Sequence, residues 1–516
     1  MFTRTSRLSY TDALSLYRHV KNGGPSCLFE SASAADKSSR MSLIGLEPPL
    51  ELVGKGERLS VRLLHPRARV FFDFLKTAYA GFVEHETESR LELLIPRAPF
   101  EGPEAERLER QNIAQPLRRL LAAFHGAEKN FMGLYGALSY RFVYLFEDIQ
   151  YSKRCPEPDF HLFLFDNILL FNHLTKDLTL YVTRETEPAV ESAHQQILHE
   201  ISRHERAGNP DNPTKILHTQ SFKPPFPPDL HHSAIHNPKP AIQIGSFRET
   251  PDDETFKRQV EQGIRLCNEG ELLEIVLSRK LTAPVEGDLL PLYEEYKAIN
   301  PSPYLFYFDF GDETLLGASP EMMLRYENGR ATLRPISGSV RRSGNPIEDH
   351  HLMMELLNSP KENSELDMLI DLGRNDLARI CKPGIEIDHY RIIEKYSHVT
   401  HTVAQLSGEP EERYTGFDAL IASLNAGTLT GAPKIAAMEY IEQIEQHTRG
   451  YYGGCIGWFL FDGDVNTAIT IRTAHVRAGL LTFCAGATLL YESEPESELK
   501  ETKIKAGAFM AAVQKF

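Results

Sequence analysis

The feature that most constrains this chain of 516 residues is a proline-rich stretch near its middle. Residues 208–240 contain the pairs Pro224-Pro225 and Pro227-Pro228, together with several histidines and asparagines. Proline fixes φ and lacks a backbone N–H, so such a stretch favours neither a helix nor a central strand. We therefore predict three parts, namely an N-terminal domain (1–207), a proline-rich linker (208–249) and a C-terminal domain (250–516).

Composition indicates an ordinary globular protein. Hydrophobic residues make up 41% of the chain and charged residues 25%, which is enough apolar material for a sizeable core. The net charge of −15 argues against nucleic acid as a partner. The six cysteines are scattered without a CxxC motif, so we expect reduced thiols. The sequence shows neither a secretory signal nor a membrane-spanning stretch, and we expect a cytoplasmic protein with no membrane contact.

Short apolar runs occur in clusters, with longer helical stretches between the clusters. In the N-terminal part, residues 162–165 and 178–182 indicate buried strands. The C-terminal part opens with a helix signal, in which Thr250 is the candidate N-cap and Pro251 the first helical residue. Clustered strands, rather than strands that alternate with helices, favour the α+β class.

The best chemical signal is a Glu-x-x-Glu pattern on two predicted helices. Glu362 and Glu365 form the first pair. Glu498 and Glu501 repeat the spacing near the C-terminus, and Lys505 follows one turn later. This spacing places both carboxylates of a pair on one helix face, and two such faces supply the oxygen ligands that Mg²⁺ prefers. Taken alone, each pair is more simply interpreted as solvated surface charge.

Glycine-rich turns and three basic residues are weaker signals. Turns of small residues, which let backbone N–H groups approach an anion, occur at residues 317–321, 335–339, 427–434 and 484–488. None matches a nucleotide-binding fingerprint. His398 and His401 are candidates for metal binding or acid–base chemistry, although a lone histidine is usually structural. Arg472 lies in an apolar strand-like run and needs an anionic partner, such as a ligand carboxylate.

These segments, taken together and in this order, resemble the chorismate-using enzymes of the anthranilate synthase large-subunit type. The matching segments are residues 271–279, 300–304, 317–321, 335–339, 371–379, 427–434, 452–454 and 471–472. A weaker similarity occurs at residues 29–32. The resemblance implies an α+β fold in which large antiparallel sheets form a sandwich, helices pack outside, and the active site lies in a cleft between the sheets.

The resemblance also implies a role for each matching residue. The implied Mg²⁺ ligands are Glu365 and Glu501, with Glu362 and Glu498 beside them. Glu321 corresponds to the general acid that protonates the departing C4 hydroxyl of chorismate, and His401 to a histidine near that leaving group. Thr428 joins this catalytic set. The implied substrate contacts are Gly338, Ser339, Tyr452, Arg472, Gly486, Ala487, Thr488 and Lys505.

The implied reaction is the amination of chorismate by ammonia, the first step of tryptophan biosynthesis. Ammonia attacks C2 with loss of the C4 hydroxyl, and the resulting aminodeoxyisochorismate loses pyruvate to give anthranilate. Ser337 stands where aminodeoxychorismate synthases carry a nucleophilic lysine, and Glu274 stands where isochorismate synthases carry a lysine that activates water. Glu274 also replaces the glutamine usual in anthranilate synthases. We count it as a catalytic candidate that binds ammonium or accepts its proton.

Partners and regulation follow from the same resemblance. About 190 residues would be needed for a glutamine amidotransferase domain after the catalytic part, so we expect a separate glutaminase subunit that delivers ammonia. Tryptophan is the expected feedback inhibitor, at a site that includes Glu30, Ser31, Pro303, Tyr304 and Leu305. The chain departs from the family pattern at Leu305 (usually Met), Met41 (commonly Lys) and Thr488 (usually Gly).

Other functions stay open at this point. The chain could be an aminodeoxyisochorismate synthase that releases the amino intermediate, or component I of an aminodeoxychorismate synthase. It could also be a tryptophan sensor without activity. His401 favours full elimination to anthranilate, and the joint presence of Glu321, His401 and both glutamate pairs argues against a sensor.

Overall fold

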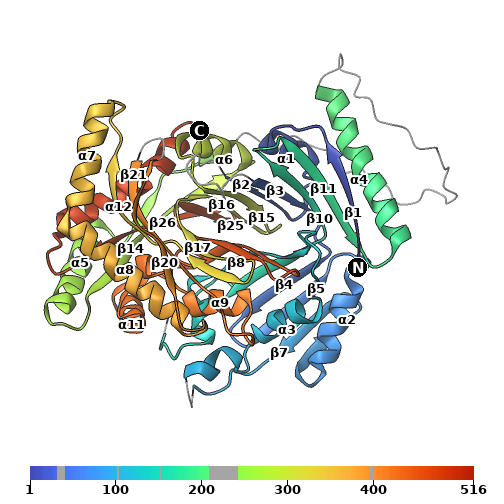
Figure 1. Cartoon of the computed structure of the whole chain (residues 1–516), viewed down its shortest axis with the longest axis horizontal. Helices are drawn as coiled ribbons and strands as arrows, with labels where there is room; N and C mark the ends of the chain where they lie inside the picture. Colours follow the sequence, from blue (N-terminus) through green and yellow to red (C-terminus); the bar gives the residue numbers. More distant parts are fainter. Residues whose placement is uncertain (32–40, 101–103, 152, 209–241, 396–398) are drawn as a thin grey trace.

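Two large antiparallel sheets face each other, and helices cover their outer sides (Figure 1). The computed structural model describes residues 1–31, 41–100, 104–151, 153–208, 242–395 and 399–516. Each sheet has 13 strands within these residues, and every pairing between them is antiparallel. This architecture confirms the predicted α+β sandwich.

The first sheet carries one wall of the cleft. In spatial order its strands are β1 (Phe2–Leu8), β11 (Asp177–Arg184), β10 (Asn167–Asn172), β3 (Met41–Leu46), β2 (Ser26–Glu30), β15 (Tyr304–Asp309), β16 (Glu313–Ser319), β25 (Thr473–Arg477), β26 (Leu480–Leu489), β14 (Glu274–Glu286) and β12 (Gln243–Ile244), while β13 (Arg248–Thr250) and β22 (Gly431–Ala432) also pair with β14.

The second sheet carries the opposite wall. Its strands are β19 (Ile336–Arg341), β21 (Val399–Gly408), β18 (Arg330–Leu333), β17 (Met322–Glu327), β24 (Val465–Ile469), β23 (Cys455–Leu460), β8 (Gly133–Leu138), β9 (Phe160–Phe165), β4 (Leu50–Lys55), β5 (Arg58–Leu63), β7 (Arg90–Leu94) and β6 (Val83–Glu86), while β20 (Glu386–Lys395) pairs with β21.

The helices divide between the two sheets. Those on the first sheet are α1 (Ala13–Val20), α4 (Glu187–Gly208), α5 (Asp253–Asn268), α6 (Leu290–Ile299), α11 (Lys434–Ile444) and α12 (Pro495–Val513). Those on the second are α2 (Arg69–Ala78), α3 (Gln115–Ala123), α7 (Pro346–Asn358), α8 (Pro360–Ala378) and α9 (Gly416–Ser423). Short 3-10 turns cover Pro66–Ala68, Ala80–Phe82, Glu104–Glu109 and Tyr140–Leu145. The short α10 (Gly427–Thr430) contacts both α8 and β14, so it bridges the two walls of the cleft.

Strands from the two halves of the chain interleave in both sheets. In the first sheet β2 pairs with β15, and in the second β8 pairs with β23. The predicted domains (1–207 and 250–516) therefore share their sheets and are not two independently folded units. Of the predicted linker, residues 209–241 lie outside the described residues, whereas β12 and β13 continue the edge of the first sheet.

Aromatic side chains fill the space between the sheets. Phe163 and Phe165 of β9 pack against Phe308 of β15, with ring centroids 6.2 Å apart in both pairs. Side chains alternate between the faces of a strand, so Tyr307 points the other way and packs against Tyr17 of α1. The sheets thus have one shared core between them and a separate core under each helical layer.

Local sequence signals located most elements and misplaced one helix start. Helix α5 begins at Asp253, and the N-cap is Asp252, whose carboxylate accepts a hydrogen bond from the Thr255 N–H at 2.9 Å. The predicted cap at Thr250 is wrong, because Thr250 pairs with β14 as part of β13. All six cysteines are free thiols. Among the described residues no helix is long and apolar enough to cross a membrane.

We predict that neither half of the chain folds alone. Residues 242–516 expressed without the N-terminal half would leave the aromatic faces and edges of β15 and β23 uncovered, since β2 and β8 normally pair with them. Each fragment is expected to be insoluble or to unfold without a cooperative transition, as measured by circular dichroism on heating. Coexpression of residues 1–208 with 242–516 should restore a soluble complex. A cooperative transition from either fragment alone would contradict the shared-sheet interpretation.

Candidate active site

The predicted catalytic residues lie on elements that meet at one end of the sandwich. Helix α8 packs on β19 and β21 of the second sheet, while α12 packs on β26 of the first. Helix α10 touches α8, β14 and β26, so these elements enclose a common space. A hollow of about 390 Å³ between α8, α10 and the β16–β17 turn is lined by Glu321 and Thr428.

Glu321 is a buried carboxyl group in the turn between β16 and β17. It accepts a hydrogen bond from the Thr428 hydroxyl, 3.1 Å from Oγ1 to Oε1, and another from the Ile336 backbone N–H. Burial raises the pKa of Glu321 to about 8, and the hydrogen bonds offset only part of that effect. Glu321 is therefore mostly protonated at neutral pH and can donate a proton.

The two glutamate pairs face each other from α8 and α12. Burial, followed by repulsion from Glu362, raises the pKa of Glu365 to about 7. Burial also raises the pKa of Glu362 and of Glu498, and the charge of Glu501 adds to the rise in both. Carboxylates from the two helices thus interact electrostatically, as the spacing argument requires. Oε2 of Glu498 is buried and has no hydrogen-bond partner among the described residues.

The four glutamates do not form a preformed metal cage. Among the described residues no three histidine, cysteine, aspartate or glutamate side chains lie close enough to surround an ion. The donor set nevertheless suits a hard divalent cation, because it consists of carboxylate oxygens whose mutual repulsion a cation would relieve. Magnesium at this place stays a prediction.

Glu274 is the least expected carboxyl group of the cleft. It begins β14, is 1% exposed, and neither of its oxygens has a hydrogen-bond partner among the described residues. Burial, with repulsion from Glu365 as a further cause, raises the pKa of Glu274 to about 8. Ile275 packs on the helical side of β14, which leaves Glu274 on the cleft side. A buried, unpartnered carboxyl group of this kind is typical of functional sites.

His401 and Gly338 join the second sheet to the glutamates. The Nδ1 atom of His401 lies 3.1 Å from the carbonyl oxygen of Gly338; since that oxygen can only accept, Nδ1 carries the proton. Burial lowers the pKa of His401 to about 4, and the charge of Arg472 lowers it too, so the ring is neutral at neutral pH. Gly338 has a φ of +67°, and a methyl group on it would lie 2.6 Å from Oε2 of Glu362.

Arg472 lies in the turn between β24 and β25, not inside a strand. Its φ is +51°, and its carbonyl oxygen accepts hydrogen bonds from the Tyr296 hydroxyl and the Ala318 N–H, both at 3.1 Å. Its half-buried guanidinium makes no ion pair with a carboxylate among the described residues. A ligand carboxylate as the anionic partner of Arg472 stays a prediction.

The β26 turn and its neighbours form the remaining predicted substrate contacts. Lys505 donates to the carbonyl oxygen of Gly486 at 2.9 Å and pairs with Glu501 at 2.6 Å. The Tyr452 hydroxyl lies so close to Gly486 that a methyl group there would be 2.6 Å from it. Ala487, by contrast, is fully buried with its methyl in the apolar cluster beneath α5 and α11, so only its backbone is available to the cleft.

The other residues predicted from the sequence are Thr488, Ser339 and His398. Thr488 follows Gly486 by two residues and shares its side of β26, opposite Val276 of β14. The backbone of Ser339 pairs with His401, whereas its side chain lies outside what the structure describes. His398 also lies outside the described residues.

Sequence reasoning missed two groups of the site. Lys361, next to Glu362, lowers the pKa of that residue and of Glu365 through its positive charge. Arg449 is fully buried under the cleft and pairs with Glu445. The signal that could have found this pair is the arginine three residues before Tyr452, with a glutamate four residues before the arginine.

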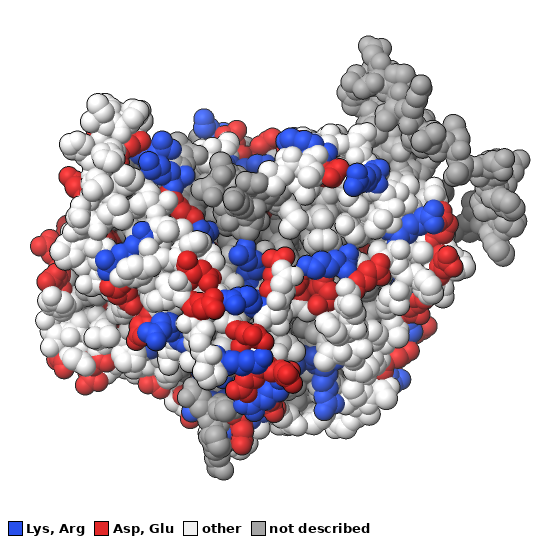
Figure 2. All heavy atoms as spheres, in the orientation of Figure 1, with Lys and Arg blue, Asp and Glu red and all other residues white. Residues whose placement is uncertain are grey.

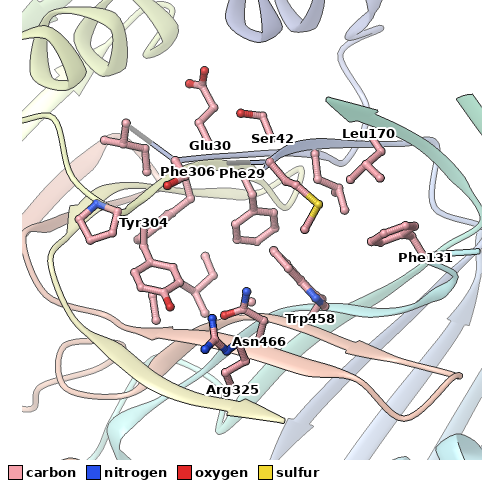
Figure 3. Close-up of a pocket in the computed structure, with 18 residues that line it drawn as sticks. Phe29, Glu30, Ser42, Phe131, Leu170, Tyr304, Phe306, Arg325, Trp458 and Asn466 are labelled. Atoms are coloured by element: carbon pink, nitrogen blue, oxygen red, sulfur yellow. The ribbon is translucent and has the colours of Figure 1, made fainter. Parts of the chain in front are cut away.

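The predicted inhibitor-site residues line a second pocket, of about 690 Å³, between the two sheets (Figure 3). Tyr304 and Trp458 contribute aromatic walls. The Glu30 carboxylate points away from the pocket, where it accepts hydrogen bonds from Tyr293 and Lys297 of α6 at 2.8 and 2.7 Å. The polar atoms left for a ligand include the Ser31 hydroxyl and the Asn466 amide oxygen, which are buried without a partner among the described residues. Pro303 and Leu305 complete this wall, and Met41 and Arg325 also line the pocket.

The surface shows no concentration of one charge sign on the face in view. Acidic and basic side chains alternate across the described residues of that face (Figure 2). This face therefore lacks the basic stripe of nucleic-acid-binding proteins.

A comparison with known protein families identifies the class to which this chain belongs. The family model for chorismate binding enzymes matches residues 83–511, and the chain therefore belongs to that family. The match spans the predicted boundary between the halves, in agreement with their shared sheets.

Within the family the chain is similar to component 1 of anthranilate synthase, which confirms the predicted resemblance. The protein of that name from Acetivibrio thermocellus is 33% identical over 413 residues, covering 78% of this chain and 80% of that protein. The one from Haloferax volcanii is 30% identical over 526 residues, covering 99% and 90%. The crystal structure of anthranilate synthase component I from Streptococcus pneumoniae superimposes with a TM-score of 0.69 at 26% identity, covering 98% and 99%.

We predict that Gly338→Ala disturbs the site more than its backbone cost explains. A non-glycine residue at positive φ costs about 1–2 kcal/mol, and here the methyl group would also push against Glu362. The matched control is Gly344→Ala, because Gly344 also has a positive φ, of +81°, with nothing near its missing side chain. Gly338→Ala should lose more stability in thermal unfolding than Gly344→Ala, because its methyl group would also lie 2.7 Å from Leu356, and only Gly338→Ala should weaken Mg²⁺ binding measured by calorimetry. Equal Mg²⁺ affinities would contradict the placement of Glu362 at the metal.

Proposed function

We propose that this chain converts chorismate and ammonia into anthranilate, pyruvate and water, as the first step of tryptophan biosynthesis. Its similarity to anthranilate synthase component 1 proteins over most of their length supports the proposal. The single observation that carries it is Glu321, a protonated carboxyl group held by Thr428 in the cleft. Such a group can supply the proton that the departing hydroxyl of chorismate requires.

The first half of the reaction exchanges a C–O bond for a C–N bond. The nitrogen lone pair of ammonia attacks C2, both double bonds of the ring shift, and the C4–O bond breaks. Glu321 gives its proton to the departing oxygen, which leaves as water, and the proton lost by the new amine restores Glu321 through solvent or a neighbouring base. His401, neutral and oriented by its bond to Gly338, presents Nε2 on the second-sheet side of the cleft.

The second half removes pyruvate from aminodeoxyisochorismate and makes the ring aromatic. A proton leaves C2, the bond between the ring carbon and the enolpyruvyl oxygen breaks, and the released group takes up a proton to become pyruvate. An oxidant is not needed, because the same elimination forms the aromatic ring. A neutral histidine is suited to accept the proton, and we assign this task to His401.

The glutamate pairs are proposed to hold Mg²⁺ against the ring carboxylate of chorismate. Glu362 and Glu365 would bind it from α8, and Glu498 and Glu501 from α12. When bound, the ion would neutralise the carboxylate charges and fix the substrate ring. Arg472 and Lys505 supply the fixed positive charge for the remaining substrate oxygens.

The choice of ammonia follows from two positions. The Ser337 hydroxyl donates to the carbonyl oxygen of Glu362 at 3.4 Å, so it is not oriented as an activated nucleophile. Glu274 supplies a carboxyl group in the cleft where a water-activating lysine would be required. We further propose that a separate glutaminase subunit supplies the ammonia, since the similar proteins are named as component 1 of their enzyme.

The decisive assay mixes the purified protein with chorismate, Mg²⁺ and ammonium and separates the products by mass. Anthranilate and pyruvate in equal amounts are expected. Accumulated aminodeoxyisochorismate would instead identify an enzyme that releases the intermediate, and isochorismate, salicylate or aminodeoxychorismate would contradict the assignment. Binding without turnover would indicate a sensor.

We predict that Glu321→Gln lowers kcat by about 10²–10⁴-fold while KM for chorismate changes little, because the proton matters only in the transition state. The acid works when protonated, so wild-type kcat/KM should fall as pH rises through about 8. The Glu321→Gln variant should not show this fall in kcat/KM at alkaline pH. Thermal midpoints are compared to verify the fold, and equal losses in kcat and chorismate affinity would contradict the assignment of Glu321 as the acid.

Tryptophan is proposed as an inhibitor that binds the pocket between the sheets. Ser31→Ala removes a buried hydroxyl that lacks another partner, so the tryptophan concentration for half inhibition should rise severalfold. The measurement is the ratio of inhibited to uninhibited rate, from which any change in basal activity cancels. An unchanged wild-type rate at saturating tryptophan would remove the proposal.

A further inference from the structure

The guanidinium group of Arg449 is buried beneath the cleft and bonded to three separate elements. Nη1 donates to the carbonyl oxygen of Leu429 in α10 at 2.6 Å. Nη2 donates to the carbonyl oxygen of Val276 in β14 at 2.7 Å. Nε and Nη2 also donate to the two carboxylate oxygens of Glu445, just past the end of α11, at 3.0 and 2.7 Å. With these bonds the guanidinium is not available to a ligand.

Glu445 is held as firmly as its partner. Oε1 accepts hydrogen bonds from both the backbone N–H and the hydroxyl of Ser278, each at 2.8 Å. Both side chains of the ion pair are almost fully buried, at 2% and 1% exposure. Burying an ion pair carries a large desolvation penalty, and a protein with hydrophobic residues in its place is often more stable. The pair of Arg449 and Glu445 is therefore better explained by a role other than stability.

Two of the elements that Arg449 joins, α10 and β14, carry a group of the proposed active site, and a third such group lies beneath its guanidinium. Leu429 directly follows Thr428, whose hydroxyl bonds Glu321. Val276 follows Glu274 by two residues on the cleft side of β14. The guanidinium also lies over the ring of Tyr452, 5.6 Å from its centroid, and the hydroxyl of that ring lies against the Gly486 turn.

We propose that Arg449, held by Glu445, is the positioning residue that fixes Thr428 against Glu321 and so sets the geometry of the proton donor. The inference rests on the proposed function in that Glu321 is taken as the acid. Helix α10 has only four residues and no side-chain cap, so bonds from outside must determine where Thr428 lies. Arg449 supplies such a bond one residue further along.

Lysine cannot replace arginine in this arrangement. Its single ammonium group cannot reach two carbonyl oxygens and both oxygens of a carboxylate in the fixed geometry of the guanidinium. Arg449→Lys therefore keeps the charge and releases Leu429 or Val276. Misplacement of a catalytic group by about 1 Å can cost roughly 10²-fold in rate.

The test compares Arg449→Lys with Arg184→Lys in the full chain. Arg184 is a matched control because it forms a buried ion pair with Asp166 at 2.9 Å, 8% and 4% exposed, on β11 of the first sheet. Rates are followed as loss of chorismate, so that the readout does not depend on which product forms. Arg449→Lys should lower kcat at least 10-fold with less than a threefold change in KM, while Arg184→Lys changes neither.

The pH profile separates positioning from general damage. The bond from Thr428 lowers the pKa of Glu321. Its loss in Arg449→Lys should therefore move the alkaline limb of the kcat/KM profile to higher pH, as in Thr428→Val. The double variant Arg449→Lys/Thr428→Val should show no further shift and little further loss in kcat, because both changes remove the same hydrogen bond from Thr428 to Glu321. A normal limb in Arg449→Lys, or additive losses in the double variant, would overturn the proposal.

Two measurements keep the test decisive if Arg449→Lys folds poorly or if chorismate is not consumed. Ser278→Ala leaves both charges in place and removes one hydrogen bond to Glu445, together with the contact between the Ser278 hydroxyl and His447, so a smaller shift of the limb in the same direction is expected. Amide hydrogen exchange of residues 427–430 should accelerate in Ser278→Ala and Arg449→Lys but not in Arg184→Lys. Unchanged hydrogen exchange at these residues would overturn the positioning role of Arg449, whatever the activity. A product other than anthranilate would overturn the proposed function alone.

Discussion

Several carboxyl groups buried together in one cleft are the constraint on which this structure depends. Glu274, Glu321 and Glu365 lie in an interior where burial raises each pKa well above that of a solvated glutamate. Such an arrangement weakens the fold unless protons, cations or a ligand compensate it. The neighbouring cations Lys361 and Lys505 compensate only part of the charge. The unpartnered oxygens of Glu274 and Glu498 mark places where a proton or a bound cation would compensate for burial.

Two shared sheets provide the rigid frame that keeps these groups apart until a ligand arrives. One wall carries Glu274 on β14, and the other holds His401 on β21. Each wall is part of a sheet that continues into strands of the N-terminal half. The two halves join where β2 pairs with β15 and where β8 pairs with β23. The distance between Glu321 and the glutamates of α8 and α12 thus depends on aromatic packing around Phe163 and Phe308, which lie between the sheets and outside this group of glutamates.

Local patterns and motifs in the sequence predicted the helices and most of the candidate site residues. Helix α12 has Pro495 in its first turn, where proline is favoured, and it carries the predicted pair Glu498 and Glu501. The interleaving of the two halves was not predictable, because the proline-rich stretch suggested a boundary while strand pairing depends on residues hundreds of positions apart. The same reason hid Arg449: its partners Val276 and Leu429 are backbone carbonyls, which no side-chain pattern reveals. A motif names a run of residues, whereas a strand directs alternate side chains to opposite faces, so the motif alone could not show that the Ala487 side chain lies in the apolar cluster.

The pocket between the sheets and the proton donor are built on consecutive strands. Tyr304, which lines the pocket, lies directly opposite Ser319 in the pairing of β15 with β16. Ser319 is fully buried, and its hydroxyl accepts a hydrogen bond from the Glu321 N–H at 3.4 Å. A ligand that displaced Tyr304 would have to displace this pair, because antiparallel partners share their backbone hydrogen bonds. A ligand that moved the Tyr304 backbone would therefore also move the turn that carries Glu321, the acid of the proposed reaction.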